Sequence, residues 1–230
     1  MALLGPAGGL VYHWRALRHR RRLWSRFTTP LAGWLAEWTP PEPALLLVGP
    51  SAGWCLPAAF LARFATIDAI EPDPLARVLL ARRFPGVAAR VRWHARDPFA
   101  SAAALAALGR DFPDHALLLA NVLGQLRDVH PGRPWRAGLA PLLAGRSWAS
   151  FHDRLSCALP LHLDDVSEPF PPTVRDEELL ARFHAGPLPN VVEVDDHETA
   201  DLFPDCPRRY LVWVLRPGRF HLIELVRSGG

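Results

Sequence analysis

Residues 44–73 constrain the fold of this chain most strongly, because they read as one strand, turn, helix and strand in succession. Ala44–Val48 is an apolar run of strand length, and a run of small residues, 49–53, follows it directly. A helical pattern begins after Pro57, and Thr66–Ile70 supplies the second strand. This order predicts a parallel βαβ unit whose turn can approach a ligand closely.

Glu71 stands directly after the second strand of this unit. In nucleotide-binding βαβ units the main-chain N–H groups of the turn face a polar or anionic ligand. An acidic side chain at the tip of the second strand accepts hydrogen bonds from ribose hydroxyls. Glu71 has the position and the chemistry for that role, and a purely structural βαβ turn is the alternative.

The same turn also permits two other interpretations. Gly49-Pro50-Ser51-Ala52-Gly53 fits the G-x-S-x-G nucleophile elbow of α/β-hydrolases, with Ser51 as the nucleophile. In that fold several strands precede the elbow, whereas residues 1–43 read as helical and basic. Residues 44–62 carry no charge and have the length of a membrane span, but two glycines and two prolines interrupt them. A buried strand and helix are therefore favoured.

Strand-like and helical patterns alternate after Glu71. We expect helices at 74–84, 101–108 and within 134–143, and strands within 87–94, at 115–120 and at 147–151. Residues 157–173 are proline-rich and irregular, 174–184 are helical, 191–194 form a brief strand, and 210–215 and 220–226 form a hairpin about Arg216-Pro217-Gly218-Arg219. The expected fold is α/β: a Rossmann-like, mainly parallel seven-stranded sheet with an antiparallel C-terminal hairpin and helices on both faces.

Residues 1–43 form a basic N-terminal extension ahead of the α/β domain at 44–230. Apolar residues recur between 10 and 38 at roughly helical spacing, and we expect one or two amphipathic helices over the strand tips, divided by Pro30. Arginines lie between the apolar positions: Arg15, Arg18, Arg20, Arg21, Arg22 and Arg26. The basic face is either simply solvated, or directed at an acidic substrate or partner, or directed at an anionic membrane surface.

Composition excludes several function classes. All 26 basic residues are arginine, so neither Schiff-base chemistry nor a P-loop lysine is available. The cysteines Cys55, Cys157 and Cys206 lack C-x-x-C spacing, which argues against a zinc site and a disulfide framework. A reducing, cytoplasmic location fits this pattern, and no signal peptide is apparent. The arginine cluster lacks single-strand-binding motifs, which disfavours nucleic acid as a partner.

The order of motifs from residue 44 onward resembles the class I S-adenosylmethionine-dependent methyltransferases. The first motif of that family appears as Leu47-Val48-Gly49-Pro50-Ser51-Ala52-Gly53, with Leu47 in place of an acid and Ser51 in place of the middle glycine. The resemblance implies that S-adenosylmethionine is the cofactor. It places Gly49, Ser51, Gly53 and Glu71 around the cofactor, Asp97 at its adenine and the stretch from Asn121 to Leu126 over its methyl group.

The expected activity is methyl transfer to a small or amphiphilic organic molecule, enclosed by the N-terminal helices and residues 157–173. His152 and Asp153, after the fifth strand, are candidates for a base and the group that orients it, and Gln125 either binds substrate or caps a helix. We expect no metal, because His184 and the Asp195–Glu198 run read as solvated groups. The alternatives are a non-catalytic binding or scaffold protein of the same fold, an NAD-dependent enzyme and a hydrolase; the oligomeric state is left open.

Overall fold

The computed structural model describes residues 9–162, 169–184, 186–188 and 193–228. Within them an eight-stranded sheet has seven strands in the order β3-β2-β1-β4-β5-β8-β7, and β6 pairs with β5 off that path. The first five strands of this path are parallel, whereas β8 and β7 are antiparallel to their neighbours. The expected fold class is confirmed, with β6 as one further short strand.

The helices and strands have the following bounds. The strands are β1 (Ala44–Val48), β2 (Thr66–Ile70), β3 (Val91–His94), β4 (His115–Ala120), β5 (Trp148–Cys157), β6 (Val194–Asp196), β7 (Arg209–Arg216) and β8 (Arg219–Arg227). The α-helices are α1 (Gly9–His19), α2 (Ser25–Glu37), α3 (Ala58–Ala62), α4 (Pro74–Arg83), α5 (Pro85–Ala88), α6 (Ala102–Asp111), α7 (Leu126–Val129), α8 (Leu139–Leu143) and α9 (Asp176–Phe183). Short 3-10 turns are η1 (Pro98–Ala100), η2 (Leu123–Gln125) and η3 (Arg136–Gly138).

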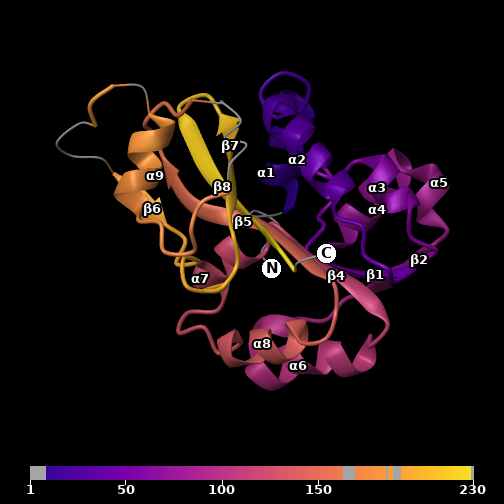
Figure 1. Ribbon diagram of the computed structural model, residues 1–230. Helices are drawn as coiled ribbons and strands as arrows, with labels where there is room; N and C mark the ends of the chain where they lie inside the picture. Colours follow the sequence, from indigo (N-terminus) through magenta and orange to yellow (C-terminus); the bar gives the residue numbers. More distant parts are fainter. Residues whose placement is uncertain (1–8, 163–168, 185, 189–192, 229–230) are drawn as a thin grey trace.

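Helices cover both faces of the sheet (Figure 1). Leu45 and Leu47 of β1 point into the hydrophobic cluster shared with α2 and α3, and Leu46 and Val48 point into the cluster shared with α6 and α8. A strand buried on both faces is largely apolar, which is why the apolar runs predicted β1 and β4 with the bounds observed. β2 also has the predicted bounds, although it carries the buried Asp68, whose carboxylate pairs with Arg92, His94 and His115. Because β1 to β5 pair in parallel, their carboxyl ends meet at one edge of the sheet.

The division of the N-terminal helices differs from the expectation. Pro30 lies inside α2, and the chain breaks earlier, between α1 and α2. The indole of Trp24 is fully buried there, donates from Nε1 to the carbonyl of Leu215 at 3.1 Å, and packs edge-on against Trp213. Anchoring Trp24 to β7 fixes the point where the two helices part, and the buried side of α2 keeps the helix continuous past the proline.

Two further expectations are corrected. β5 is ten residues long rather than ending at Phe151, because β8 pairs with it from Ala149 to Cys157. Its polar residues read as a strand end in the sequence, but all of them are buried and hydrogen-bonded. β6 starts at Val194 and ends at Asp196, later than the expected strand at 191–194; residues 191 and 192 lie outside the described residues. α4 ends at Arg83, before Pro85, and a separate short helix, α5, begins at Pro85. In the described ranges no helix is both long and apolar enough to span a membrane.

Candidate functional site

A cavity of about 480 Å³ lies at the carboxyl ends of the parallel strands. Its wall includes the residues that follow β1, β2, β3 and β4, together with Phe151 of β5, and α1 and α7 contribute from two other sides. Six residues predicted from the sequence line it: Gly49, Ser51, Glu71, Asp97, Asn121 and Gln125. Gly53 belongs to the same turn but does not line the cavity. Its size suits a small organic ligand or cofactor.

The turn after β1 is held in a left-handed conformation. Gly49 has φ +69°, and a Cβ there would lie 2.8 Å from Cβ of Val122, so no larger residue fits. Ser51 also has a positive φ, +50°, and its main-chain N–H donates to Oε2 of Glu71 at 2.8 Å. The other carboxylate oxygen, Oε1, accepts from the N–H of Asp73 at 2.9 Å. One carboxylate therefore joins the turn after β1 to the turn after β2.

Glu71 is buried, with 5% of its surface exposed, yet it lines the cavity. Burial raises the pKa of Glu71, and the N–H groups of Asp73 and Ser51 offset only part of this rise. A carboxylate has about four lone-pair sites, and the two main-chain donors use two of them. Glu71 can therefore still accept hydrogen bonds from the two hydroxyls of a ribose.

Asp97 and Asn121 line the cavity from the loops after β3 and β4. Oδ1 of Asp97 accepts from the N–H of Phe99 at 3.0 Å, and its Oδ2 lies 3.0 Å from Nε2 of His130, which also lines the cavity. Asn121 has φ +54°, and its Oδ1 is buried without a hydrogen-bond partner among the described residues. That oxygen is a buried acceptor whose capacity no described residue uses.

Gln125 uses its side-chain amide within the fold. Its Nε2 donates to the carbonyl of Asn121 at 2.9 Å, which stabilises the turn after β4. Gln125 nevertheless remains part of the cavity wall, so a structural bond and a ligand contact are both compatible with its position.

α1 closes one side of the cavity through Gly9 and Tyr12. His13 attaches this helix: its Nδ1 accepts from Nε1 of Trp54 at 2.9 Å, and its Nε2 lies 3.1 Å from Oδ2 of Asp73. Since Nδ1 is an acceptor, the neutral ring carries its proton on Nε2 and donates it to Asp73. These contacts link α1 to the loops after both β1 and β2.

The buried side of α1 is the opposite of the one that the apolar periodicity predicts. Leu10, Trp14 and Leu17 are more than half exposed, whereas His13 and Ala16 are buried. Sequence reasoning therefore missed Tyr12 and His13, and the only available signal was two polar aromatic residues beside an apolar helix pattern. Residues 157–173, also expected to enclose the cavity, do not line it in their described part.

Asp153 lies behind Asn121 in a buried polar cluster. Its Oδ1 is 2.6 Å from Nδ1 of His221, and His197 is close enough that the three residues offer ligand atoms within 4.8 Å of one another. Burial raises the pKa of Asp153, but His221, His197 and hydrogen bonding from Asn121 outweigh it, so the net shift is downward. A Cβ on Gly124 would lie 2.7 Å from Cβ of Asp153, which shows how closely the turn after β4 packs on this cluster.

His152 does not pair with Asp153, in contrast to the expectation. Successive side chains of a strand point to opposite faces, so the two residues are separated by the sheet. His152 is fully buried; its Nδ1 lies 2.9 Å from Oγ of Ser150, and its Nε2 lies 3.6 Å from Oε1 of Glu224. It does not line the cavity, and His221 is the histidine that faces Asp153.

The remaining polar candidates are engaged in the fold. In the Asp195–Glu198 run, the three acids contact arginines: Asp195 contacts Arg127 and Arg219, Asp196 contacts Arg154, and Glu198 contacts Arg133. His184 lies 2.9 Å from the carbonyl of Pro160 through Nδ1. In the described ranges no histidine hydrogen-bonds Ser51, so Ser51 lacks the neighbouring base that activates the nucleophile of a serine hydrolase.

Comparison with known proteins gave only distant structural likenesses. No protein-family model and no curated protein matches the chain. The N-methyltransferase NodS from Bradyrhizobium japonicum WM9 is 13% identical, with 86% of this chain and 94% of that chain covered and a TM-score of 0.44. A DhpI–SAM–HEP complex is 14% identical, with 95% of this chain and 94% of that chain covered and a TM-score of 0.46. Magnesium protoporphyrin IX methyltransferase (ChlM) from Synechocystis PCC 6803 with bound SAM is 12% identical, with 99% of this chain and 88% of that chain covered and a TM-score of 0.46. The fold class of the chain rests on its strand order.

Proposed function

We propose that the protein is an S-adenosylmethionine-dependent methyltransferase that acts on a small or amphiphilic organic molecule. The observation that carries the proposal is the bond from the Ser51 N–H to Glu71, which places a left-handed turn and an acidic strand tip around one cavity. The strand order, with its antiparallel end, is that of the family which the motifs resemble. It also differs from the usual dinucleotide-binding sheet, which disfavours NAD.

The residues present fit this cofactor. Glu71 has free acceptor sites for the ribose, Gly49 leaves room where any Cβ would fill the turn, and Asp97 stands with His130 where the adenine edge is expected. Asn121 lines the cavity, and its buried Oδ1 lacks a partner within the described residues. Leu47 is buried in a hydrophobic cluster and supplies no such acceptor.

When bound, S-adenosylmethionine supplies an electrophilic methyl group. The chain's contribution is to hold the acceptor in line with that group, since positioning accounts for most of such a rate enhancement. Asp153 and His221 are positioning residues, because they support the turn that carries Asn121. Burial raises the pKa of Tyr12 well above its ordinary value and that of Cys55 to about 12, so both stay protonated and neutral. Neither is therefore a base at neutral pH.

Calorimetric titration with S-adenosylmethionine, S-adenosylhomocysteine and NAD tests the cofactor assignment. We expect both sulfur nucleotides to bind and NAD not to bind, because the Gly49–Gly53 turn is shorter than a pyrophosphate loop requires. Absence of binding by either sulfur nucleotide at millimolar concentration would refute the proposal.

A non-catalytic binding protein is the second candidate, and the apolar Leu47 is the observation that favours it. It predicts cofactor binding without turnover on any substrate panel, together with co-purification of a stable protein partner. Methyl transfer to any small molecule from a radiolabelled donor would exclude this second candidate.

A further inference from the structure

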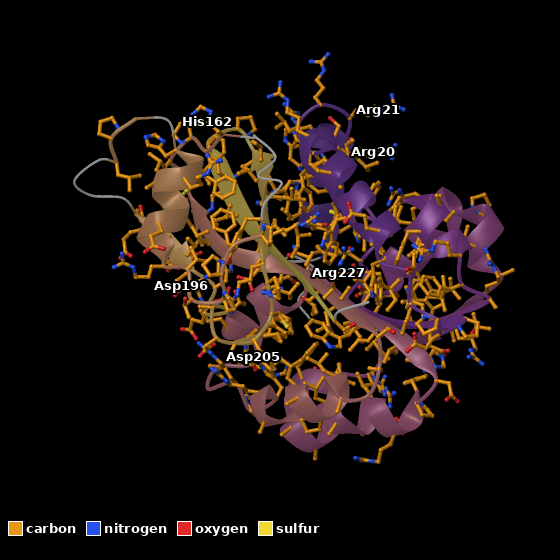
Figure 2. The ribbon with its side chains drawn as sticks, in the orientation of Figure 1. Arg20, Arg21, His162, Asp196, Asp205 and Arg227 are labelled. Atoms are coloured by element: carbon orange, nitrogen blue, oxygen red, sulfur yellow. The ribbon has the colours of Figure 1, made fainter. Side chains whose placement is uncertain are left out.

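A second cavity, of about 390 Å³, lies beside the first, between the turn after α1 and the segment that leads into α3. Three arginines, Arg20, Arg21 and Arg83, line it together with the indole of Trp54. Arg20 and Arg21 project from the end of α1 at the edge of the molecule, well apart from the labelled acids Asp196 and Asp205 (Figure 2). We refer to this second cavity as the arginine cavity.

No carboxylate neutralises these three guanidinium groups within the described residues, where the ion pairs all involve other cations. Arg83 is held in place by a bond from Nη1 to the carbonyl of Ala52, and its guanidinium lies 4.3 Å from the Trp54 ring centroid. Arg20 lies 5.5 Å from the same centroid. Burial, together with the charge of Arg20, lowers the pKa of Arg83 to about 10. Like charges gathered in a recess without an acid create a favourable site for an anion.

The two cavities share part of their walls. Cys55 and Leu56 line both, and the bond from Arg83 to Ala52 reaches the turn that carries Gly49 and Ser51. The two cavities therefore adjoin at Cys55 and Leu56, and a ligand that spans them would place an anionic group among the arginines and its other end in the first cavity. A planar guanidinium binds carboxylate or phosphate through two parallel hydrogen bonds, so both anions fit.

We propose that the arginine cavity binds a carboxylate or phosphate group of the methyl acceptor, whose reacting atom enters the first cavity. This inference rests on the proposed methyl transfer and defines its substrate class as small anionic molecules. It also gives part of the basic N-terminal segment a specific role.

Binding of inorganic phosphate and of succinate tests the site without any turnover. Each anion is titrated by calorimetry at low ionic strength, and the indole N–H signal of Trp54 is followed by NMR. We expect both anions to bind and to shift that signal, and Arg20→Gln/Arg21→Gln to weaken binding by about ten-fold or more. Arg20→Lys/Arg21→Lys should recover part of the loss, because charge returns without the planar fork.

The matched control is Arg22→Gln/Arg26→Gln, which removes the same charge from two exposed arginines that do not line the cavity. An equal loss of affinity in this control would overturn the site in favour of diffuse attraction. An equal loss of S-adenosylhomocysteine affinity in Arg20→Gln/Arg21→Gln would instead assign the arginines to the carboxylate of the cofactor. Displacement of phosphate by vesicles of anionic phospholipid, but not by neutral vesicles, would overturn the inference in favour of a membrane surface.

The two proposals fail separately. If phosphate binds as expected but neither sulfur nucleotide binds the wild-type protein, the methyl-acceptor assignment falls and the oxyanion site stands. If the sulfur nucleotides bind but neither phosphate nor succinate does, the arginine cavity is not an anion site and the proposed function stands.

Discussion

The side chain of Glu71 accepts a hydrogen bond of 2.8 Å from the main-chain N–H of Ser51, twenty positions earlier in the chain. The acid at the tip of β2 thus holds the turn that follows β1. Its second oxygen holds Asp73, whose own side chain caps α4 at Leu75 and contacts His13 of α1. A single carboxylate is therefore linked to three walls of the cavity.

Glu71→Ala should weaken binding of S-adenosylhomocysteine by roughly ten- to a hundred-fold, because it removes the proposed ribose acceptor and the anchor of the turn. Calorimetry measures the dissociation constant, and thermal unfolding reports whether the variant is folded. Asp114→Ala, which removes an exposed acid away from the cavity, is the matched control and should leave affinity unchanged. Unchanged affinity in folded Glu71→Ala would contradict the cofactor assignment.

Affinity for the sulfur nucleotide should fall in mild acid. Burial raises the pKa of Glu71 above its ordinary value of 4.5, and only the carboxylate can accept both ribose hydroxyls. Affinity is therefore full above the raised pKa and declines as the pH falls through it.

The stability of the free protein has the opposite pH dependence. Glu71 binds its proton more readily when the protein is folded, so its contribution to the free energy of unfolding rises as the pH falls through the same window. Glu71→Gln should remove both dependences, as titrations from neutral pH downward would show.

Ser51→Gly should preserve binding. The N–H that bonds Glu71 remains, and glycine adopts the φ of +50° without strain, so affinity should change less than about three-fold. Gly49→Ala is the contrasting variant, since its Cβ would collide with Val122, and it should lower affinity or stability. Labelling by a fluorophosphonate that disappears in Ser51→Gly would instead support a serine hydrolase.

His13→Ala should loosen α1. The variant loses the bonds to Trp54 and Asp73, and each buried bond typically contributes about 1 kcal/mol. We expect faster amide hydrogen exchange in α1 and faster release of S-adenosylhomocysteine. His19→Ala at the end of the same helix, which does not line the cavity, is the control. Equal exchange rates in His13→Ala and the wild type would show that these bonds do not attach the helix.

Glu224→Ala should destabilise the fold by about 3 to 5 kcal/mol, because it leaves Arg208 buried without its partner. Tyr210 also donates to this carboxylate, at 2.7 Å, and His152 lies beside it. Urea denaturation gives the loss of unfolding free energy. His152→Ala should destabilise less and leave cofactor affinity intact; a large loss of affinity without loss of stability would return His152 to the functional site.

Local sequence determined the βαβ unit at the centre of the protein. Apolar runs of strand length predicted β1 and β4 with their observed bounds, because strands buried on both faces are largely apolar. β2 has the predicted bounds as well, although the buried Asp68 interrupts its apolar residues. The left-handed turn after β1 and the acid after β2 were equally apparent, since glycine spacing and strand ends are local features. Six of the nine predicted site residues line the cavity, because they follow strand ends that the sequence makes recognisable. The three that do not line it are Gly53, His152 and Asp153.

Tertiary structure decided what depends on contacts between distant segments. The length of β5 follows from its pairing with β8, the pairing of Asp153 with His221 crosses the same two strands, and His152 is turned to the other face. The buried side of α1 is set by Trp54 and Asp73, which override its apolar periodicity. The arginine cavity likewise joins the end of α1, the turn after β1 and the end of α4. Residues so far apart in the chain leave no joint pattern in the sequence, because only packing of the sheet and helices brings them together.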